Sequence, residues 1–207
     1  MAEVVKLNPE SPEQELVDRA ARLLRGGGVA AFPTDTVYGL GCSASSRRGL
    51  LLMRELKGLR TSPFIVLIAE KEWLRDLVRD VPPVAADLMR RYWPGPLTLV
   101  LDAAPGVFEG VRSGEGTVAV RNPSSRFCLS LCRALEAPIA STSANPAGAP
   151  PAMGAAEVEA TFGASIDLIV DGGTAPERRP STLVDARGEK PLVLREGALT
   201  LDLDGGP

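Results

Sequence analysis

The sequence predicts an α/β fold with both strand directions in its sheet. Short apolar runs bounded by glycine and proline alternate with segments of helical periodicity, and several of these runs follow one another with no helix between them. Strands joined without a helix pair in antiparallel fashion, so we expect a mixed sheet. The 207 residues have 44% apolar content, which predicts one domain over 1–207 with a core at about 8–199 and a short tail at 200–207.

Helices are expected where apolar residues recur with helical spacing between start and stop signals. The first should begin at Ser11, which forms a capping-box pattern with the residues that follow, and should end at Gly26. A helix after Pro123 should be capped by Ser124 or Ser125. The other expected helices cover 47–56, 72–79, 84–92 and 155–162.

Strands are expected at the short apolar runs, and two of these runs lead into stretches rich in hydroxyls. The expected strands cover 29–32, 64–69, 97–101, 117–121, 139–140, 166–170, 182–185 and 192–195. The hydroxyl-rich stretches follow at 34–41 and 141–148. Because open α/β sheets bind ligands at the carboxyl ends of strands, we interpret both stretches as ligand loops.

Composition excludes several kinds of catalysis. The chain has no histidine, which removes Ser-His-Asp and Cys-His catalysis and every histidine-based zinc site. Cys42, Cys128 and Cys132 fit packing positions in a reducing compartment better than a disulfide framework. Neither a membrane span nor a secretory leader is visible, so we expect a cytoplasmic protein without membrane contact.

Three loops have the composition of a pocket for polyphosphate and a small carboxylate. They are Thr34, Thr36 and Tyr38; Ser141, Thr142, Ser143 and Asn145; and Lys57 and Arg60 with Thr61 and Ser62. Arg121 and Arg195 each close an apolar strand, which favours a ligand role for both. Neither of the two best-known glycine-rich phosphate loops lies between a strand and a helix, so a nucleotide would be bound without them.

Each of these features also has a structural explanation. The hydroxyl-rich stretches could be turns, and Lys57 and Arg60 could complement a helix dipole. Asp35 and Asp171 are interpreted as turn carboxylates rather than catalytic acids. The sequence therefore favours catalysis by positioning and charge neutralisation over catalysis by a tuned proton donor.

Several ordered motifs resemble the YrdC family and cover nearly the whole chain. They are FPTDTVYGLG at 32–41, WPGPLT at 93–98, TVAVR at 117–121, STSAN at 141–145, DGG at 171–173, STLVD at 181–185 and LREGA at 194–198. The resemblance implies a twisted α/β sheet around a concave basic cavity. It also implies an activity that joins L-threonine, bicarbonate and ATP into threonylcarbamoyl-AMP and pyrophosphate, for the t6A modification of tRNA by a downstream threonylcarbamoyl transferase.

The resemblance also implies roles for individual residues. Lys57 and Arg60 would be catalytic, stabilising negative charge. The threonine and bicarbonate site would contain Thr34, Thr36, Tyr38, Arg121 and Ser141, and the nucleotide site Thr117, Ser143, Asn145 and Arg195. Mg²⁺ would be bound through the ATP phosphates, with no metal site made by the protein.

The chain departs from the family pattern in two places. The family's arginine is expected two positions after the lysine, whereas this chain has Arg60 three positions after Lys57, and the loop to Pro63 is one residue shorter. Leu67 and Ser125 stand where relatives often have histidine. Three alternatives stay open: an inactive or divergent paralogue that binds nucleotide or RNA, a module that binds tRNA or double-stranded RNA through the five cations between 47 and 60, and an adenylating enzyme with another carbamoyl donor.

Overall fold

The computed structural model describes residues 1–58 and 63–202. Within them, ten strands form one sheet in the order β1-β8-β2-β3-β7-β4-β6-β5-β9-β10. The strands are β1 (Glu3–Lys6), β2 (Ala30–Pro33), β3 (Tyr38–Ser43), β4 (Ile65–Leu67), β5 (Leu97–Asp102), β6 (Thr117–Arg121), β7 (Ile139–Ser143), β8 (Leu168–Asp171), β9 (Thr182–Asp185) and β10 (Leu192–Arg195).

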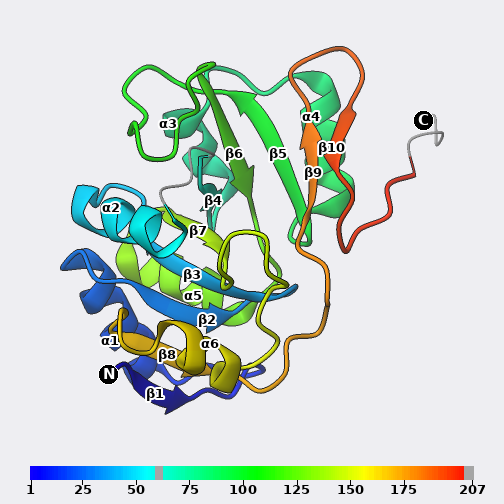
Figure 1. Ribbon diagram of the computed structural model, residues 1–207. Helices are drawn as coiled ribbons and strands as arrows, with labels where there is room; N and C mark the ends of the chain where they lie inside the picture. Colours follow the sequence, from blue (N-terminus) through cyan, green and yellow to red (C-terminus); the bar gives the residue numbers. More distant parts are fainter. Residues whose placement is uncertain (59–62, 203–207) are drawn as a thin grey trace.

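The sheet is mixed, as predicted. Strand pairs β1–β8, β2–β8, β4–β6 and β5–β9 are parallel, and the remaining neighbours are antiparallel. Strands β2, β3 and β8 run nearly across the direction of β5, β6 and β9 in Figure 1, so the sheet is strongly twisted.

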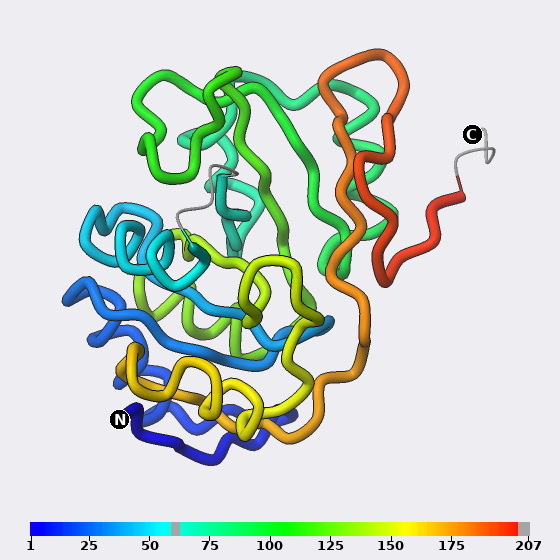
Figure 2. Tube along the Cα trace, viewed as in Figure 1, coloured from blue at the N-terminus to red at the C-terminus, as the bar shows by residue number. Residues whose placement is uncertain are grey.

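Helices cover both faces of the sheet. They are α1 (Gln14–Arg25), α2 (Arg47–Leu56), a 3₁₀ turn (Lys71–Trp73) that leads into α3 (Leu74–Leu77), α4 (Pro83–Tyr92), α5 (Arg126–Leu135) and α6 (Ala155–Phe162). Helices α1 and α5 bury their apolar stripes together against one face, and the other helices pack on the opposite face. Figure 2 shows α1 and α5, more than a hundred residues apart, on the same side of the chain trace.

Alternation along β2 divides its side chains between the two cores. Ala30 and Phe32 belong to the core under α1 and α5, whereas Val29 and Ala31 belong to the core on the other face. A strand covered on both faces has no polar positions, which is why this segment is a continuous apolar run in the sequence.

Several expected boundaries are wrong. Residues 38–41 of the first expected loop belong to the buried strand β3, residues 141–143 of the second belong to β7, and β1 is an additional strand. In β3, packing requires a glycine at Gly41, because a Cβ there would lie 2.7 Å from the Phe32 ring. Helix α1 begins after Glu13 without a side-chain cap, so Ser11 does not cap it, whereas Ser125 caps α5 as predicted.

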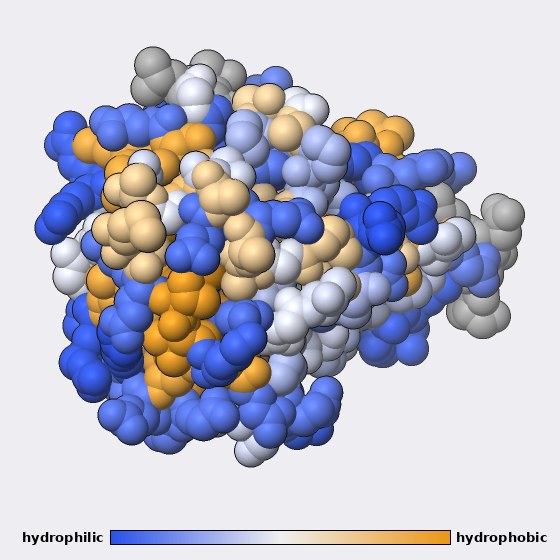
Figure 3. Space-filling model, turned by 60° about the horizontal axis from the view of Figure 1, so that its bottom comes forward, coloured by the Kyte–Doolittle hydropathy of each residue, from blue (hydrophilic) through white to orange (hydrophobic). Residues whose placement is uncertain are grey.

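The visible surface is mixed in character. The face turned forward in Figure 3 is mostly hydrophilic, with apolar residues gathered in smaller patches between charged side chains. Among the described residues, no helix has both the length and the apolar character that a bilayer crossing requires.

Candidate active site

A pocket with two lobes is lined largely by residues of β3, β4, β6 and β7. The first lobe is lined by Thr34, Thr36, Val37, Tyr38, Gly39, Ile65, Leu67, Arg121, Ser141, Thr142, Ser143, Pro180 and Ser181. The second lobe has a volume of about 320 Å³ and is lined by Pro63, Phe64, Ile65, Val100, Thr117, Ala119, Ser141, Thr142, Ser143, Pro180, Leu183 and Arg195. Because the lobes have five lining residues in common, they are neighbouring parts of one pocket.

Sheet register brings the lining residues together. On β7, Ser141 pairs with Gly41 of β3 on one side and with Ile65 of β4 on the other. Strand β4 in turn pairs with β6, which places Leu67 opposite Arg121. The hydroxyls of β7 and the arginine of β6 therefore reach one pocket from strands that are distant in sequence.

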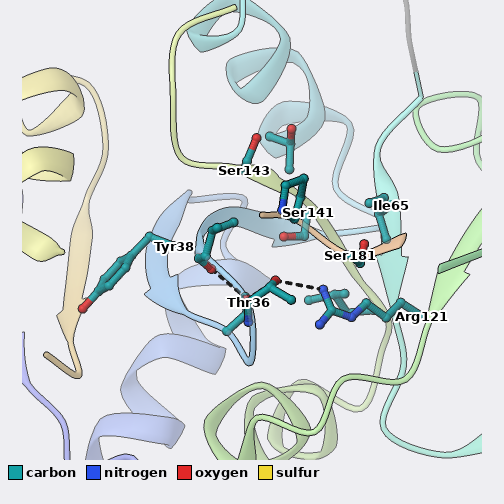
Figure 4. A pocket seen from close by; sticks show the side chains of 13 residues that line it. Thr36, Tyr38, Ile65, Arg121, Ser141, Ser143 and Ser181 are labelled. Carbon is teal, nitrogen blue, oxygen red and sulfur yellow. Dashed lines mark hydrogen bonds between the residues drawn. The ribbon is translucent and has the colours of Figure 1, made fainter. Parts of the chain in front are cut away.

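Arg121 is the best-organised group of the first lobe. Its terminal nitrogens bond to the Thr36 hydroxyl at 3.2 Å and to the Asp35 carboxylate at 2.6 Å, and its Nε donates to the Gly95 carbonyl at 3.0 Å. The Thr34 hydroxyl lies 3.0 Å from that of Thr36. Figure 4 shows Thr36 and Arg121 facing each other, with Ser141 and Ser181 beside them.

Tyr38 contributes its backbone side to the first lobe, while its ring points away from it (Figure 4). Its hydroxyl donates to the Gly173 carbonyl at 2.7 Å and accepts from the Gly172 N–H at 3.2 Å. Burial raises the pKa of this phenol to about 12, so it stays protonated near neutral pH. The phenol thus ties β3 to the turn after β8.

The second lobe contains three of the four residues predicted to bind nucleotide. Ser143 and Thr117 line it from β7 and β6, and Arg195 lines it from β10 while donating to the Ser181 carbonyl at 2.8 Å. The Thr117 hydroxyl lies 2.8 Å from that of Ser113. Asn145 lines neither lobe, and its amide nitrogen donates to the carbonyls of Pro146 and Ala149.

Lys57 is buried against Ser143 and Asn145 and lines neither lobe. Only 1% of the residue is exposed, and its ammonium donates to the Ser143 carbonyl at 3.0 Å and to both the carbonyl and the side-chain oxygen of Asn145. Two of the three predicted loops therefore meet, because Thr36 and Ser143 line one lobe, and Lys57 of the third contacts Ser143. Thr61 and Ser62 lie outside the described residues. Arg60 lies outside the described residues.

Charge in the pocket comes from arginine. Among the residues given above for the two lobes, Arg121 and Arg195 are cations and none is a carboxylate. The expected concave basic cavity stays a prediction. One of the two arginines, Arg121, is paired with Asp35. In the described part of the chain, no three His, Cys, Asp or Glu side chains gather where they could hold a metal ion.

Sequence reasoning missed several residues of the site. The prediction that Asp35 is only a turn carboxylate is wrong, because Asp35 is the ion-pair partner of Arg121. Ser181 lines the first lobe and hydrogen-bonds with Thr98, with 2.7 Å between the hydroxyl oxygens. Ile65 and Leu67 form an apolar wall there. The position of Asp35 between two site threonines was the available indication.

Comparison with known proteins assigns the chain to a family. The family profile named Sua5, YciO and YrdC, described as telomere recombination, matches residues 22–197. The chain belongs to the Sua5/YciO/YrdC family. It is 39% identical over 194 residues to the threonylcarbamoyl-AMP synthase of Pyrococcus abyssi, covering 93% of this chain and 57% of that protein. It is 41% identical to the enzyme of the same name from Thiobacillus denitrificans, covering 78% of this chain and 86% of that protein.

Solved structures of the family have the same fold. The crystal structure of P. abyssi Sua5 complexed with L-threonine superposes with a TM-score of 0.91 at 38% identity, covering 96% of this chain and 58% of that chain. This chain thus spans less than two thirds of the P. abyssi relative, and it matches the family over nearly its own full length.

Proposed function

We propose that this chain synthesises threonylcarbamoyl-AMP from L-threonine, bicarbonate and ATP, with release of pyrophosphate. The observation that carries the proposal is the division of one pocket into two lobes with different chemistry. The first lobe offers Arg121 and the hydroxyls of Thr36 and Ser141, which suit a small amino acid. The second offers Thr117 and Arg195 in a larger space, which suits a nucleotide.

The reaction would take place beside Ser141, Thr142 and Ser143, the residues of β7 that line both lobes. The threonine amine attacks the carbon of bicarbonate, and loss of water leaves a carbamate. A carbamate oxygen then attacks the α-phosphorus of ATP, the bond to the bridging oxygen of the β-phosphate breaks, and pyrophosphate leaves. Ser141 and Ser143 stand where the two substrates would meet, and enclosure by the lobes would shield the labile carbamate from water.

In this proposal Lys57 acts without lining either lobe. Its ammonium fixes the Ser143 carbonyl and the Asn145 side chain, so it holds the nucleotide-side loop in place while its charge lies close to where the phosphates would bind. Arg60 would neutralise phosphate charge from the following loop. Magnesium would take its ligands from ATP phosphates and water, because this hard ion keeps several of its waters when it binds phosphates.

The biological setting is part of the same proposal. The adenylate would be passed to a threonylcarbamoyl transferase that modifies tRNA, in the cytoplasm. Direct RNA binding has weaker support, because Arg47 and Arg48 are exposed on α2 whereas Lys57 is buried. The expected run of cations at 47–60 therefore does not form one exposed surface in the described residues.

An assay of pyrophosphate release tests the proposal. The purified protein is incubated with magnesium-ATP and bicarbonate, each amino acid is added in turn, and the adenylate is identified by mass spectrometry. We expect pyrophosphate only when threonine and bicarbonate are both present. Release that is independent of bicarbonate, or equal for all amino acids, would contradict the proposal.

A matched pair of arginine variants tests the assignment of the lobes. Arg195→Ala removes a cation from the second lobe and should raise the KM for ATP about tenfold while changing the KM for threonine little. Arg187→Ala removes a cation that pairs with Asp185 and Asp102 outside both lobes, and should leave both constants unchanged. Equal effects of the two variants would contradict the assignment.

A further inference from the structure

Asp35 bridges Arg121, which is buried, and the start of α5 at the surface. The side chains of Arg121 and Asp35 are only 5% and 11% exposed, and one carboxylate oxygen accepts from the arginine at 2.6 Å. The other oxygen accepts from both the backbone N–H and the hydroxyl of Ser124, at 3.1 and 2.9 Å. The carboxylate is therefore fixed on both sides, and it fixes the arginine in turn.

The hydrogen bonds of Arg121 leave part of its guanidinium for a ligand. A guanidinium has five N–H donors. Three of them are used, by Gly95, Thr36 and Asp35, which leaves one N–H on each terminal nitrogen. Since Arg121 lines the first lobe, these two donors are available to an anionic group there.

We propose that Asp35 is a positioning residue that orients Arg121 for the carboxylate of the amino-acid substrate. This inference rests on the proposed function for the identity of the substrate. Asp35 lines neither lobe and faces a neighbouring cavity with Thr34 and Ser124, so in this proposal it acts on the first lobe through Arg121. Its negative charge also balances the arginine when the pocket is empty, which lowers the cost of burying that cation.

Two physical effects oppose each other when Asp35 is changed to asparagine, and this makes the test sharp. Removing the negative charge alone would strengthen the attraction of Arg121 for a carboxylate. However, Arg121 and Ser124 donate to different carboxylate oxygens, and asparagine places an NH₂ group, which cannot accept, at one of these two positions. If orientation is what Asp35 supplies, Asp35→Asn weakens carboxylate binding despite the gain in positive charge.

The experiment measures binding calorimetrically in the absence of ATP, with L-threonine and L-threoninamide as the two probes. We expect the parent protein to prefer threonine, and Asp35→Asn to bind threonine about tenfold or more weakly and to lose most of that preference. The KM for ATP should change less than about twofold, because the second lobe does not contain Asp35 or Arg121. Unchanged or tighter threonine binding, or an unchanged preference, would overturn the inference.

Two further variants guard against loss of folding. Asp185→Asn removes a partly buried carboxylate paired with Arg187 outside the pocket, and should keep the preference for threonine. Ser124→Ala removes one of the donors to Asp35 and should weaken threonine binding to an intermediate degree, even if Asp35→Asn does not fold. An unchanged Ser124→Ala variant would overturn the inference.

The outcomes separate this inference from the proposed function. If the parent protein binds threonine through its carboxylate but releases no pyrophosphate, the proposed function fails while the role of Asp35 stands or falls on the variants. If the parent shows no preference for threonine over threoninamide, the role of Asp35 is overturned whatever the reaction is.

Discussion

The ammonium of Lys57 donates a 3.2 Å hydrogen bond to the side-chain oxygen of Asn145, a residue 88 positions later in the chain. The same nitrogen donates to the Ser143 carbonyl at 3.0 Å. One buried cation therefore connects the end of α2 to the end of β7, the strand whose last three residues line both lobes. Its contribution is structural as well as electrostatic.

Replacing Lys57 should cost stability as well as activity. In Lys57→Met, the oxygens that now accept from the ammonium lose a charged donor inside the protein, and we expect a loss of about 2 to 3 kcal/mol in the free energy of unfolding, measured with urea. Pyrophosphate release should fall by orders of magnitude, because Ser143, which lines both lobes, is no longer held in position by the ammonium.

Lys71→Met is the control for this prediction. Lys71 is exposed and makes one long bond of 3.5 Å to the Met89 carbonyl, so its loss should change stability by less than about 0.5 kcal/mol. A Lys57→Met protein as stable as the parent would show that the buried hydrogen bonds contribute little.

The sequence could predict the mixed sheet and most of its elements, because these depend on local pattern. It could not predict that Lys57 is buried or that Asp35 pairs with Arg121, since both depend on contacts 86 or more positions apart. The prediction of a loop over 34–41, which includes Gly39 and Gly41, is partly wrong for the same reason. Their local pattern indicates a turn, whereas they are glycines because neighbouring side chains approach β3 closely.

Two glycines on β3 should therefore respond differently to alanine. A methyl group at Gly41 would lie 2.7 Å from the Phe32 ring and 3.0 Å from Ile139, so Gly41→Ala should lose about 1 to 3 kcal/mol of stability. A methyl group at Gly39 would meet the Ser141 hydroxyl at 3.1 Å, inside the first lobe. Gly39→Ala should raise the KM for threonine with a smaller loss of stability.

Urea unfolding and steady-state kinetics on the two glycine variants test this contrast. Each variant is the other's control, since both place the same methyl group on the same strand. If Gly39→Ala were the less stable protein, or if Gly41→Ala alone affected the KM for threonine, the assignment of Gly39 to the pocket wall would be wrong.

Tyr38 should make stability depend on alkaline pH. Burial raises the pKa of Tyr38 in the folded protein from 10.0 to about 12. The contribution of the protonated phenol to the free energy of unfolding is therefore fully present below pH 10 and is lost as pH rises toward 12. Tyr38→Phe should lose about 1 kcal/mol at pH 7, because the bonds to Gly172 and Gly173 disappear. Its stability should then fall less steeply between pH 10 and pH 12 than that of the parent, as followed by urea unfolding at each pH. Parallel pH profiles would contradict this assignment.

The cysteines should resist thiol reagents in the folded protein. Cys42, Cys128 and Cys132 are free and buried, and burial raises the pKa of Cys42 and of Cys128 to about 12. A buried protonated thiol reacts only when the structure opens, so labelling by a disulfide reagent at pH 8 should be at least about a hundredfold slower than in urea. Unfolding should expose all three thiols, which gives the full stoichiometry as an internal control. Rapid labelling of one thiol in the native protein would show that its helix or strand opens locally. Cys42 is the informative position, because it lies on β3, the strand that contributes Tyr38 and Gly39 to the first lobe.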